Sequence, residues 1–411
     1  MRIITIPMQD NKTATVLVLV EAGSKYEDRK ENGISHFLEH MCFKGTTKRP
    51  KVGDISLELD KLGAQLNAFT SHEFTGYYAK AYSKNIFKLI DVISDMYCNP
   101  IFNKKEIEKE KGVIIEEMNM YKDLPMREVA DSFKEVLHGD TPAGRTILGD
   151  KGFIKKAKQQ DLIDYRNKHY VASATTIVVA GNIDEKKVVK EIEKKFECVS
   201  ESRKHKKEKV KEIQNKPQAK IVYKKSDQSH LILGVRAFDF FKKDAMVVSI
   251  LAGVLGSGMS SRLFYKLREE MGVCYYLGAE NSTTTDTGCL KVSAGVDNRR
   301  VEEVVGVILK EFNKLKIKLV GESELKKVKE KMIGSLILEL ESSDSLAEYY
   351  GVLDILGRPL LKPQEKIKMI KAVTSQDIKR VANKIFINKS LNLAIVGPIK
   401  DKKNLQSILR F

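Results

Sequence analysis

Two stretches of this 411-residue sequence repeat each other at a fixed distance. Residues 160–182 are echoed by residues 376–398: both begin with Gln-Asp and both carry an apolar run that ends at a glycine, with an offset of 216 residues (377 − 161 and 397 − 181). In each copy the spacing of the apolar residues predicts a helix that leads into a buried strand. The repeat indicates an internal duplication, so we expect two domains that share one fold.

The length of the chain supports the same division, because 411 residues are too many for one small core. The stretch between the two copies is polar and rich in lysine, most densely over residues 203–209. We therefore expect an N-terminal domain over residues 1–202, a basic linker over 203–220 and a second domain over 221–411.

The net charge of +17 comes mainly from lysines that are spread along the chain. No aromatic residues interleave with the basic ones as they do in nucleic-acid-binding motifs, so we interpret the charge as solvated surface and expect no nucleic-acid partner. No run of eighteen apolar residues is present, and we expect no membrane span.

The five cysteines are scattered and contain no C-x-x-C pair. They favour reduced thiols and argue against a cysteine-based zinc site. The first residues resemble a strand and not a signal peptide, which favours a cytoplasmic location.

A five-residue stretch, His36-Phe37-Leu38-Glu39-His40, carries the chemistry. On a helix, residues four apart share a face, so His36 and His40 can hold one ion between them. Glu39 lies at the edge of that face, where a carboxylate can take a proton from a water molecule. The order H-x-x-E-H is the inverse of the H-E-x-x-H zinc protease motif, and it predicts a zinc site that needs a third ligand.

A long helix predicted from about Asn103 to Tyr121 offers that third ligand. Glu110 and Glu117 are seven residues apart on it, two turns along one face. Glu116 is the competing candidate, and the spacing alone does not decide between Glu116 and Glu117.

Between these two helices the chain predicts a β-hairpin over residues 63–81. The first strand of this hairpin can present an unpaired edge to an extended peptide. His72 lies at the polar turn of the hairpin, and we interpret it as a surface histidine and not as a metal ligand.

The second half contains a glycine-rich stretch over residues 255–264, followed by Arg268 and Tyr275. It lacks the lysine and hydroxyl of a phosphate-binding loop, so we interpret it as the N-terminus of a helix.

Taken together, residues 36–46, residues 66–70, the Glu110/Glu117 helix and the Arg268/Tyr275 segment resemble the M16 metallopeptidases, the inverted zincins. The resemblance covers essentially the whole chain. It implies an α+β fold of two homologous domains of the LuxS/MPP-like type, each a largely antiparallel sheet packed with helices.

The resemblance also assigns roles to residues. It implies that His36, His40 and Glu117 bind one Zn²⁺ per chain, that Glu39 is the general base, and that Glu110 supports the site from behind. It further implies that Asn67, Ala68, Phe69 and Phe43 of the first domain bind the substrate. Arg268 and Tyr275 of the second domain are implied to be catalytic: they hold the substrate's backbone and stabilise the oxyanion, in the active site of a partner subunit.

The expected activity is that of a zinc metalloendopeptidase that cleaves short or unfolded polypeptides inside the chamber of a dimer. A homodimer is expected, and a heterodimer is the alternative. The other reading of the chain is a non-catalytic or partner-dependent subunit of an M16 heterodimer.

Overall fold

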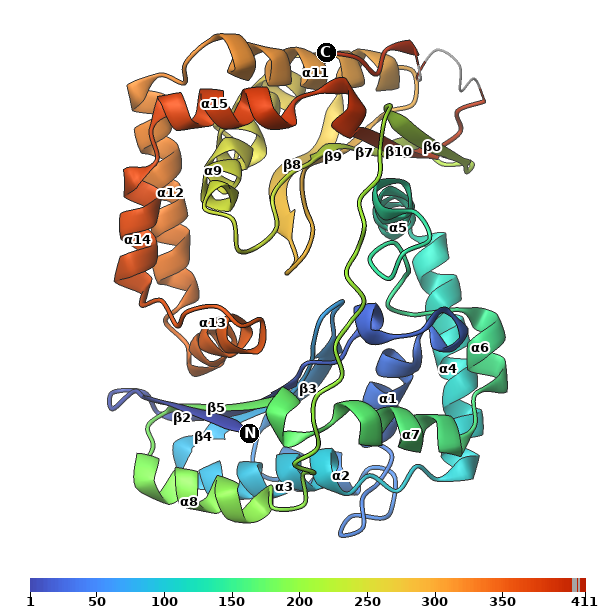
Figure 1. The fold of residues 1–411 in the computed structure, drawn as a ribbon, viewed down its shortest axis with the longest axis vertical. Helices are drawn as coiled ribbons and strands as arrows, with labels where there is room; N and C mark the ends of the chain where they lie inside the picture. Colours follow the sequence, from blue (N-terminus) through green and yellow to red (C-terminus); the bar gives the residue numbers. More distant parts are fainter. Residues whose placement is uncertain (401–404, 406) are drawn as a thin grey trace. The chain divides into compact units, whose positions relative to one another are not determined.

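The computed structural model describes residues 1–400, 405 and 407–411 and divides into two compact units (Figure 1). The first unit contains Met1–Asn119, Arg145–Glu208 and Ile337–Leu361. The second unit contains Met120–Gly144, Lys209–Leu336 and Lys362–Phe411, as far as they are described. Each unit is built around one five-stranded sheet.

The two sheets have the same topology. The first consists of β1 (Arg2–Pro7), β2 (Thr13–Val20), β3 (Gln65–Thr70), β4 (Thr75–Tyr82) and β5 (Thr175–Gly181), in the order β1-β5-β2-β4-β3. The second consists of β6 (Gln218–Tyr223), β7 (Gln228–Arg236), β8 (Cys274–Thr283), β9 (Gly288–Asp297) and β10 (Leu391–Gly397), in the order β6-β10-β7-β9-β8. The matching order confirms two copies of one α+β fold. In each sheet one pair, β1 with β5 or β6 with β10, is parallel and the other pairs are antiparallel.

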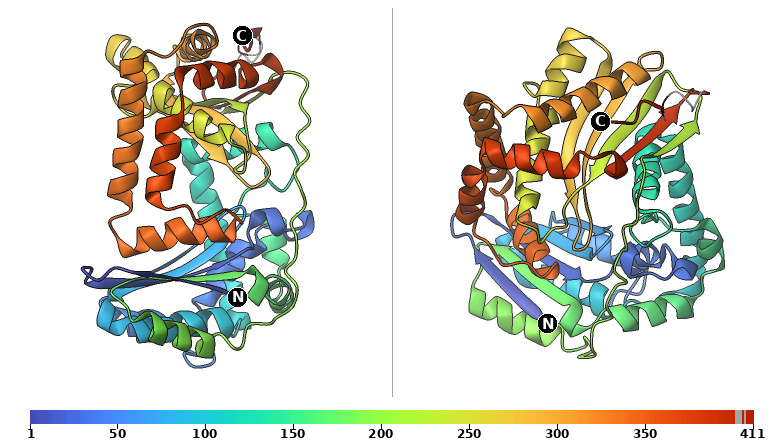
Figure 2. Two further views of the ribbon diagram at one scale, coloured as in Figure 1. Left: turned by 60° about the vertical axis from the view of Figure 1, so that its left-hand side comes forward. Right: turned by 45° about the horizontal axis from the view of Figure 1, so that its top comes forward.

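The sheet of the first unit is covered on both faces (Figure 2). Its helices are α1 (Ile34–Cys42), α2 (Asp54–Asp60), α3 (Ile86–Cys98), most of α4 (Lys104–Asp123), α6 (Lys151–Lys156), α7 (Gln159–His169), α8 (Glu185–Lys195) and α13 (Ser343–Ile355). Val16 and Val18 of β2 point into the core formed with α1 and α3, and Leu17 points to the opposite face, where Ala347 of α13 packs. Because both faces are buried, β2 is a continuous apolar run.

The second unit repeats this arrangement with α5 (Pro125–His138), α9 (Asp244–Gly256), α10 (Arg262–Phe264), α11 (Val301–Ile317), most of α12 (Glu322–Glu339), α14 (Pro363–Ala372) and α15 (Ser375–Ile385). Phe133 of α5 packs on one face of the sheet against Ile232 and Ala394. Each sheet is thus covered on one face by a helix from the other half of the sequence: α13 covers the first sheet and α5 the second.

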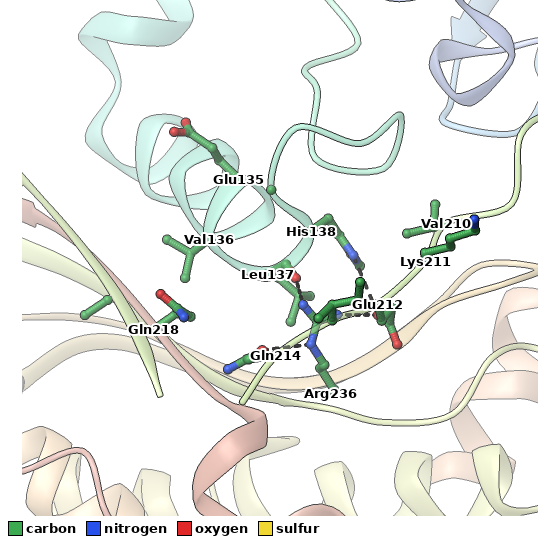
Figure 3. A pocket seen from close by; sticks show the side chains of 13 residues that line it. Glu135, Val136, Leu137, His138, Val210, Lys211, Glu212, Gln214, Gln218 and Arg236 are labelled. Atoms are coloured by element: carbon green, nitrogen blue, oxygen red, sulfur yellow. Dashed lines mark hydrogen bonds and ion pairs between the residues drawn. The ribbon is translucent and has the colours of Figure 1, made fainter. Parts of the chain in front are cut away.

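A pocket of about 370 Å³ lies in the second unit between the end of α5 and residues 210–214 (Figure 3). Arg236 reaches into this region, where its guanidinium donates to Glu212 at 2.5 Å and to Gln214 at 2.8 Å. The guanidinium also donates to the carbonyl oxygen of Leu137. These contacts tie the end of α5 to the sheet.

The glycine-rich stretch after α9 differs from its prediction. Gly256 ends α9 and Gly258 has a positive φ of 94°, which favours glycine, before α10 begins at Arg262. Only Gly258 therefore lies between the two helices, and the predicted helix N-terminus comes after it, at Arg262.

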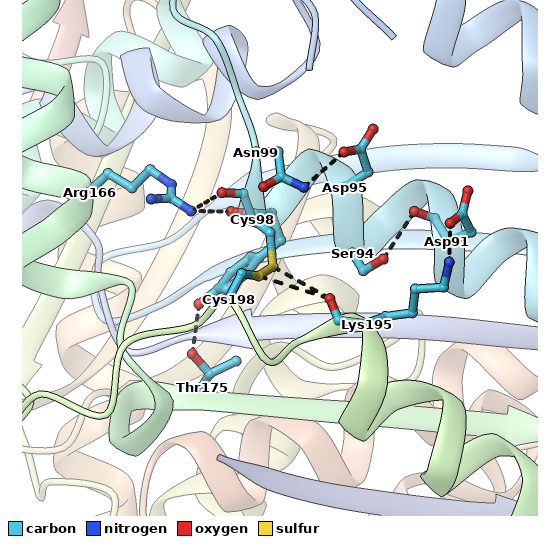
Figure 4. Close-up of a disulfide and its surroundings, with 10 residues drawn as sticks. Asp91, Ser94, Asp95, Cys98, Asn99, Arg166, Thr175, Lys195 and Cys198 are labelled. Atoms are coloured by element: carbon cyan, nitrogen blue, oxygen red, sulfur yellow. Dashed lines mark hydrogen bonds and ion pairs between the residues drawn. A yellow bond between two sulfur atoms is a disulfide. The ribbon is translucent and has the colours of Figure 1, made fainter. Parts of the chain in front are cut away.

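The expectation of five reduced thiols is wrong for one pair of cysteines. Cys98 at the end of α3 and Cys198 after α8 form a disulfide, with 6.2 Å between their Cα atoms (Figure 4). The two residues are 100 positions apart, and the packing of α3 beside α8 brings them together. Cys42, Cys274 and Cys289 are free and buried.

Within residues 1–400, 405 and 407–411, no helix is both long enough and apolar enough to cross a membrane.

The loop after α1 is anchored by a buried arginine. Arg49 donates to Asp95 at 2.7 Å, to Asp91 at 2.7 Å and to Glu58 at 2.5 Å. The hydrogen bonds from Arg49 lower the pKa of Glu58 to about 2. Asp95 is 1% exposed, so the negative charge of its carboxylate depends on Arg49 for compensation.

We predict that Arg49→Ala lowers the free energy of unfolding of the first unit by about 3–5 kcal/mol, because it leaves the buried carboxylate of Asp95 without its cation. Urea unfolding measures the loss. Lys48→Ala is the matched control: Lys48 contacts the same Asp91 at 3.2 Å from a half-exposed position, and we expect about 1 kcal/mol or less. Equal losses for the two substitutions would contradict the anchoring role of Arg49.

Candidate metal centre

Helix α1 has one buried apolar face and one polar face. Phe37, Leu38 and Met41 are fully buried in the core of the first unit. The helix begins after Gly33, which has a positive φ of 104°. The helical period then places His36, Glu39 and His40 together on the other side, as the sequence predicts.

The structure brings three predicted ligands together. Nε2 of His36 and Nε2 of His40 each lie 3.7 Å from Oε2 of Glu117, which comes from α4. One ligand atom from each of the three residues lies within 4.8 Å of the others. Two imidazole nitrogens and a carboxylate oxygen are a donor set that suits zinc and leaves a fourth position open.

The neighbouring glutamate is excluded from this group. Glu116 is exposed and accepts a hydrogen bond from Nδ2 of Asn119 at 3.4 Å. The choice between Glu116 and Glu117, which the spacing left open, follows from the rotation of α4 about its axis.

Glu110 orients the second histidine. Its Oε2 lies 3.0 Å from Nδ1 of His40, and its Oε1 lies 2.6 Å from Nζ of Lys44. A proton on Nδ1 donates to this carboxylate and leaves the lone pair of Nε2 facing Glu117, as in many histidine–metal sites. Although burial raises the pKa of Glu110, the hydrogen bonds from His40 and Lys44 outweigh it, and the net shift is downward.

The first histidine is held in its neutral form. Burial, together with the nearby His40, lowers the pKa of His36 to about 3. A neutral imidazole offers the lone pair that a metal ion requires. The residues present therefore fit a divalent metal ion.

Glu39 has the opposite shift from Glu110. Burial raises the pKa of Glu39, even though Oγ1 of Thr70 donates to its Oε2 at 2.5 Å. Thr70 ends β3, so this hydrogen bond joins the candidate base to the edge of the sheet. A carboxylate with a raised pKa is suited to accept and return a proton near neutral pH.

Strand β3 is an edge strand: among the described residues, β4 is its only strand partner. Asn67, Ala68 and Phe69 lie in its centre. Oδ1 of Asn67 accepts from the backbone N–H of Ala68 at 2.9 Å, and Phe43 lies at the C-terminal end of α1. His72 is not part of the metal group, and its Nδ1 lies 2.7 Å from Oγ of Ser24.

The remaining predicted residues belong to the second unit. Arg268 lies in a π-helical turn, Tyr265–Glu270, and its Nη1 donates to the carbonyl oxygen of Cys274 at 2.6 Å. Tyr275 follows at the start of β8 and is 57% exposed.

The sequence did not single out Lys44 or Thr70 as members of the site. Both lie inside the stretches that carry the family resemblance, but their roles depend on contacts with residues 66 and 31 positions away. No local pattern encodes such contacts.

Comparison with known proteins places the chain in a family. The model of the insulinase family of peptidases, family M16, matches residues 2–151, and the model of the M16 peptidase inactive domain matches residues 156–332. The chain belongs to the M16 family.

This M16 protein is similar to bacterial and mitochondrial relatives over nearly its whole length. It is 32% identical to a Rickettsia felis protein named an uncharacterized zinc protease, over 96% of the chain and 95% of the relative. A Bacillus subtilis protein named uncharacterized zinc protease YmxG is also 32% identical, with 96% of each protein covered. The human mitochondrial-processing peptidase subunit beta is 32% identical over 96% of the chain and 82% of the relative.

Solved structures share the fold. A protease from Helicobacter pylori matches with a TM-score of 0.90 at 23% identity, covering 96% of each chain. A Pseudomonas fluorescens structure described as an M16 peptidase inactive domain matches with a TM-score of 0.88 at 17% identity, covering 98% of this chain and 97% of that one.

We predict that Glu117→Ala weakens metal binding by more than about 100-fold, beyond the loss typical of residues that only orient ligands. Metal content after dialysis, measured by inductively coupled plasma mass spectrometry, tests this. Glu116→Ala removes the adjacent carboxylate and is expected to keep the metal content of the unaltered protein. A reversal of the two results would assign the third ligand to Glu116.

Proposed function

We propose that this M16 protein is a zinc-dependent endopeptidase that hydrolyses peptide bonds in short or unfolded polypeptides. The observation that carries the proposal is the grouping of His36 and His40 of α1 with Glu117 of α4, next to Glu39 on the same face of α1. The relatives named zinc proteases support the same activity.

In this proposal His36, His40 and Glu117 hold one zinc ion per chain. When bound, zinc supplies Lewis acidity and lowers the pKa of a water molecule to about 7. Glu39 accepts the proton of the attacking water at its carboxylate and delivers it to the leaving amine. Thr70 keeps that carboxylate in place, and Glu110 fixes the tautomer of His40.

The substrate is proposed to add as an extended strand to the free edge of β3. Register supports this proposal: Ser71 N–H bonds to the carbonyl of Phe74 across the turn, so Ala68 lies at a position whose backbone groups point away from β4. Ala68 then supplies the backbone hydrogen bonds to the substrate strand. Asn67 and Phe69, whose backbone groups pair with β4, are proposed to contact the substrate through their side chains, with Phe43 beside them.

The second domain is proposed to contribute Arg268 and Tyr275 to substrate binding and to stabilise the developing oxyanion. In the division proposed from the sequence, the catalytic domain covers residues 1–202, the linker covers 203–220 and the second domain covers 221–411. We propose that a homodimer encloses the substrate chamber in the cytoplasm. The name of the human relative, a subunit, makes a heterodimer the alternative.

Glu39→Gln tests the catalytic role. The amide cannot accept a proton, so we expect kcat to fall by about 10²–10⁴-fold. Cleavage of quenched fluorogenic peptides measures activity, and metal analysis is expected to show zinc retained. Glu116→Gln, the same chemical change at an exposed glutamate, is the control. If Glu39→Gln cleaves the peptides as fast as the unaltered protein, the proposed activity is refuted.

Tyr275→Phe tests the contribution of the second domain. Loss of a hydroxyl donor to the oxyanion is expected to lower kcat by about 10²-fold. Tyr265→Phe is a matched control, since Tyr265 is 56% exposed against 57% for Tyr275 and lies ten positions earlier. If both variants keep full activity, Tyr275 has no part in the reaction.

A further inference from the structure

A buried glutamate outside the metal group binds the N-terminal turn of α1. Glu27 is 3% exposed, and its Oε1 accepts the backbone N–H of Ser35 at 2.9 Å. Its Oε2 accepts the backbone N–H of Gly33 at 2.7 Å and Nδ2 of Asn32 at 2.8 Å. Both oxygens are acceptors from residues that immediately precede His36.

These hydrogen bonds satisfy donors that a helix N-terminus leaves free. Gly33 precedes the first helical residue, Ile34, and Ser35 is the second. The N–H of Ser35 therefore has no partner within the helix. A carboxylate at this end is also favoured by the helix dipole. Glu27 therefore accepts hydrogen bonds at the N-terminus of α1 in place of an N-cap side chain.

The same turn is held from two other sides. Oγ of Ser35 lies 2.7 Å from the hydroxyl of Tyr165 on α7. Nδ2 of Asn32 also donates to the carbonyl oxygen of Thr146 at 3.2 Å, and the carbonyl oxygen of Asn32 accepts from Asp150 N–H at 3.0 Å.

Close backbone contact completes the arrangement. A Cβ on Gly149 would lie 2.2 Å from the carbonyl oxygen of Asn32 and 2.3 Å from Cα of Gly33. Gly149 has a φ of 86°, so this position requires glycine on both counts. Residues 146–150 thus pack directly against the turn that Glu27 holds.

We propose that Glu27 is a positioning residue for the metal centre: its carboxylate fixes the first turn of α1 and thereby the direction of His36 and Glu39. This inference rests on the proposed function. His36 directly follows Ser35, the residue that Glu27 holds by its backbone. A displacement of about 1 Å at a catalytic group can cost about 10²-fold in rate, so fixing this turn bears directly on the chemistry.

Glu27→Gln is the primary test. Glutamine has the same shape but only one acceptor oxygen. Its NH2 group therefore faces a backbone N–H donor, of Gly33 or of Ser35, and one of these hydrogen bonds is lost. In cobalt-substituted protein we expect a changed visible absorption spectrum, which reports the geometry of the ligands. In the zinc form we expect kcat to fall about 10–100-fold with KM within about twofold, the loss typical of residues that orient metal ligands.

Val188→Ala is the matched control for general destabilisation. Val188 is fully buried in the same core on α8, and its truncation weakens the first unit without touching the turn before His36. We expect its cobalt spectrum and kcat to equal those of the unaltered protein. If Glu27→Gln behaves like Val188→Ala in both readouts, the positioning role is overturned.

Asn32→Ala decides the matter if Glu27→Gln does not fold. It removes one hydrogen bond to Glu27 and keeps the carboxylate, and a smaller change of the same kind in spectrum and kcat supports the role. An unchanged spectrum and kcat would overturn it.

The cobalt spectrum separates this inference from the proposed function. Unaltered protein that binds cobalt but cleaves no peptide would refute the activity, and the spectra would still judge Glu27. Unaltered protein that binds no cobalt would refute both.

Discussion

The site depends on how one short helix is fixed at both of its ends. Helix α1 buries Phe37, Leu38 and Met41, and it offers His36, Glu39 and His40 on its other face. Hydrophobic packing alone is non-directional and would leave small rotations and shifts of the helix open. Directional hydrogen bonds, from the first turn to Glu27 and from His40 to Glu110, remove that freedom.

Two glutamates of the site have their pKa values moved in opposite directions. Burial raises the pKa of Glu39, while His40 and Lys44 keep the pKa of Glu110 low despite its own burial. Two carboxylates whose environments shift their pKa values in opposite directions are suited to separate roles. Glu110 stays charged and orients an imidazole, whereas Glu39 is suited to exchange a proton.

Among the described residues, the candidate metal ligands come from one unit of the duplicated fold only. The two sheets have the same strand order, but α9, the first helix after the second sheet begins, is buried along most of its length and carries apolar side chains. The helices α5 and α13 each cover the sheet of the unit to which they are assigned, although each comes from the other half of the sequence. Their burial shows that the cores of the two units draw on both halves of the chain.

The sequence by itself determined the features that depend on short-range period. The i, i+4 spacing puts His36 and His40 on one face, the seven-residue spacing aligns Glu110 with Glu117, and the 216-residue offset predicts the repeated helix and strand. These hold because helix and strand geometry is set by neighbouring residues. The two-domain α+β fold followed from the repeat together with the family resemblance.

Only the tertiary structure decided which groups from distant segments meet. It turned Glu117 and not Glu116 toward the histidines, joined Thr70 to Glu39, and placed Glu27 beneath the first turn of α1. It also paired Cys98 with Cys198, against the expectation of reduced thiols. The physical reason is that such contacts are set by the packing of whole elements against each other, and a sequence pattern of a few residues does not record that packing.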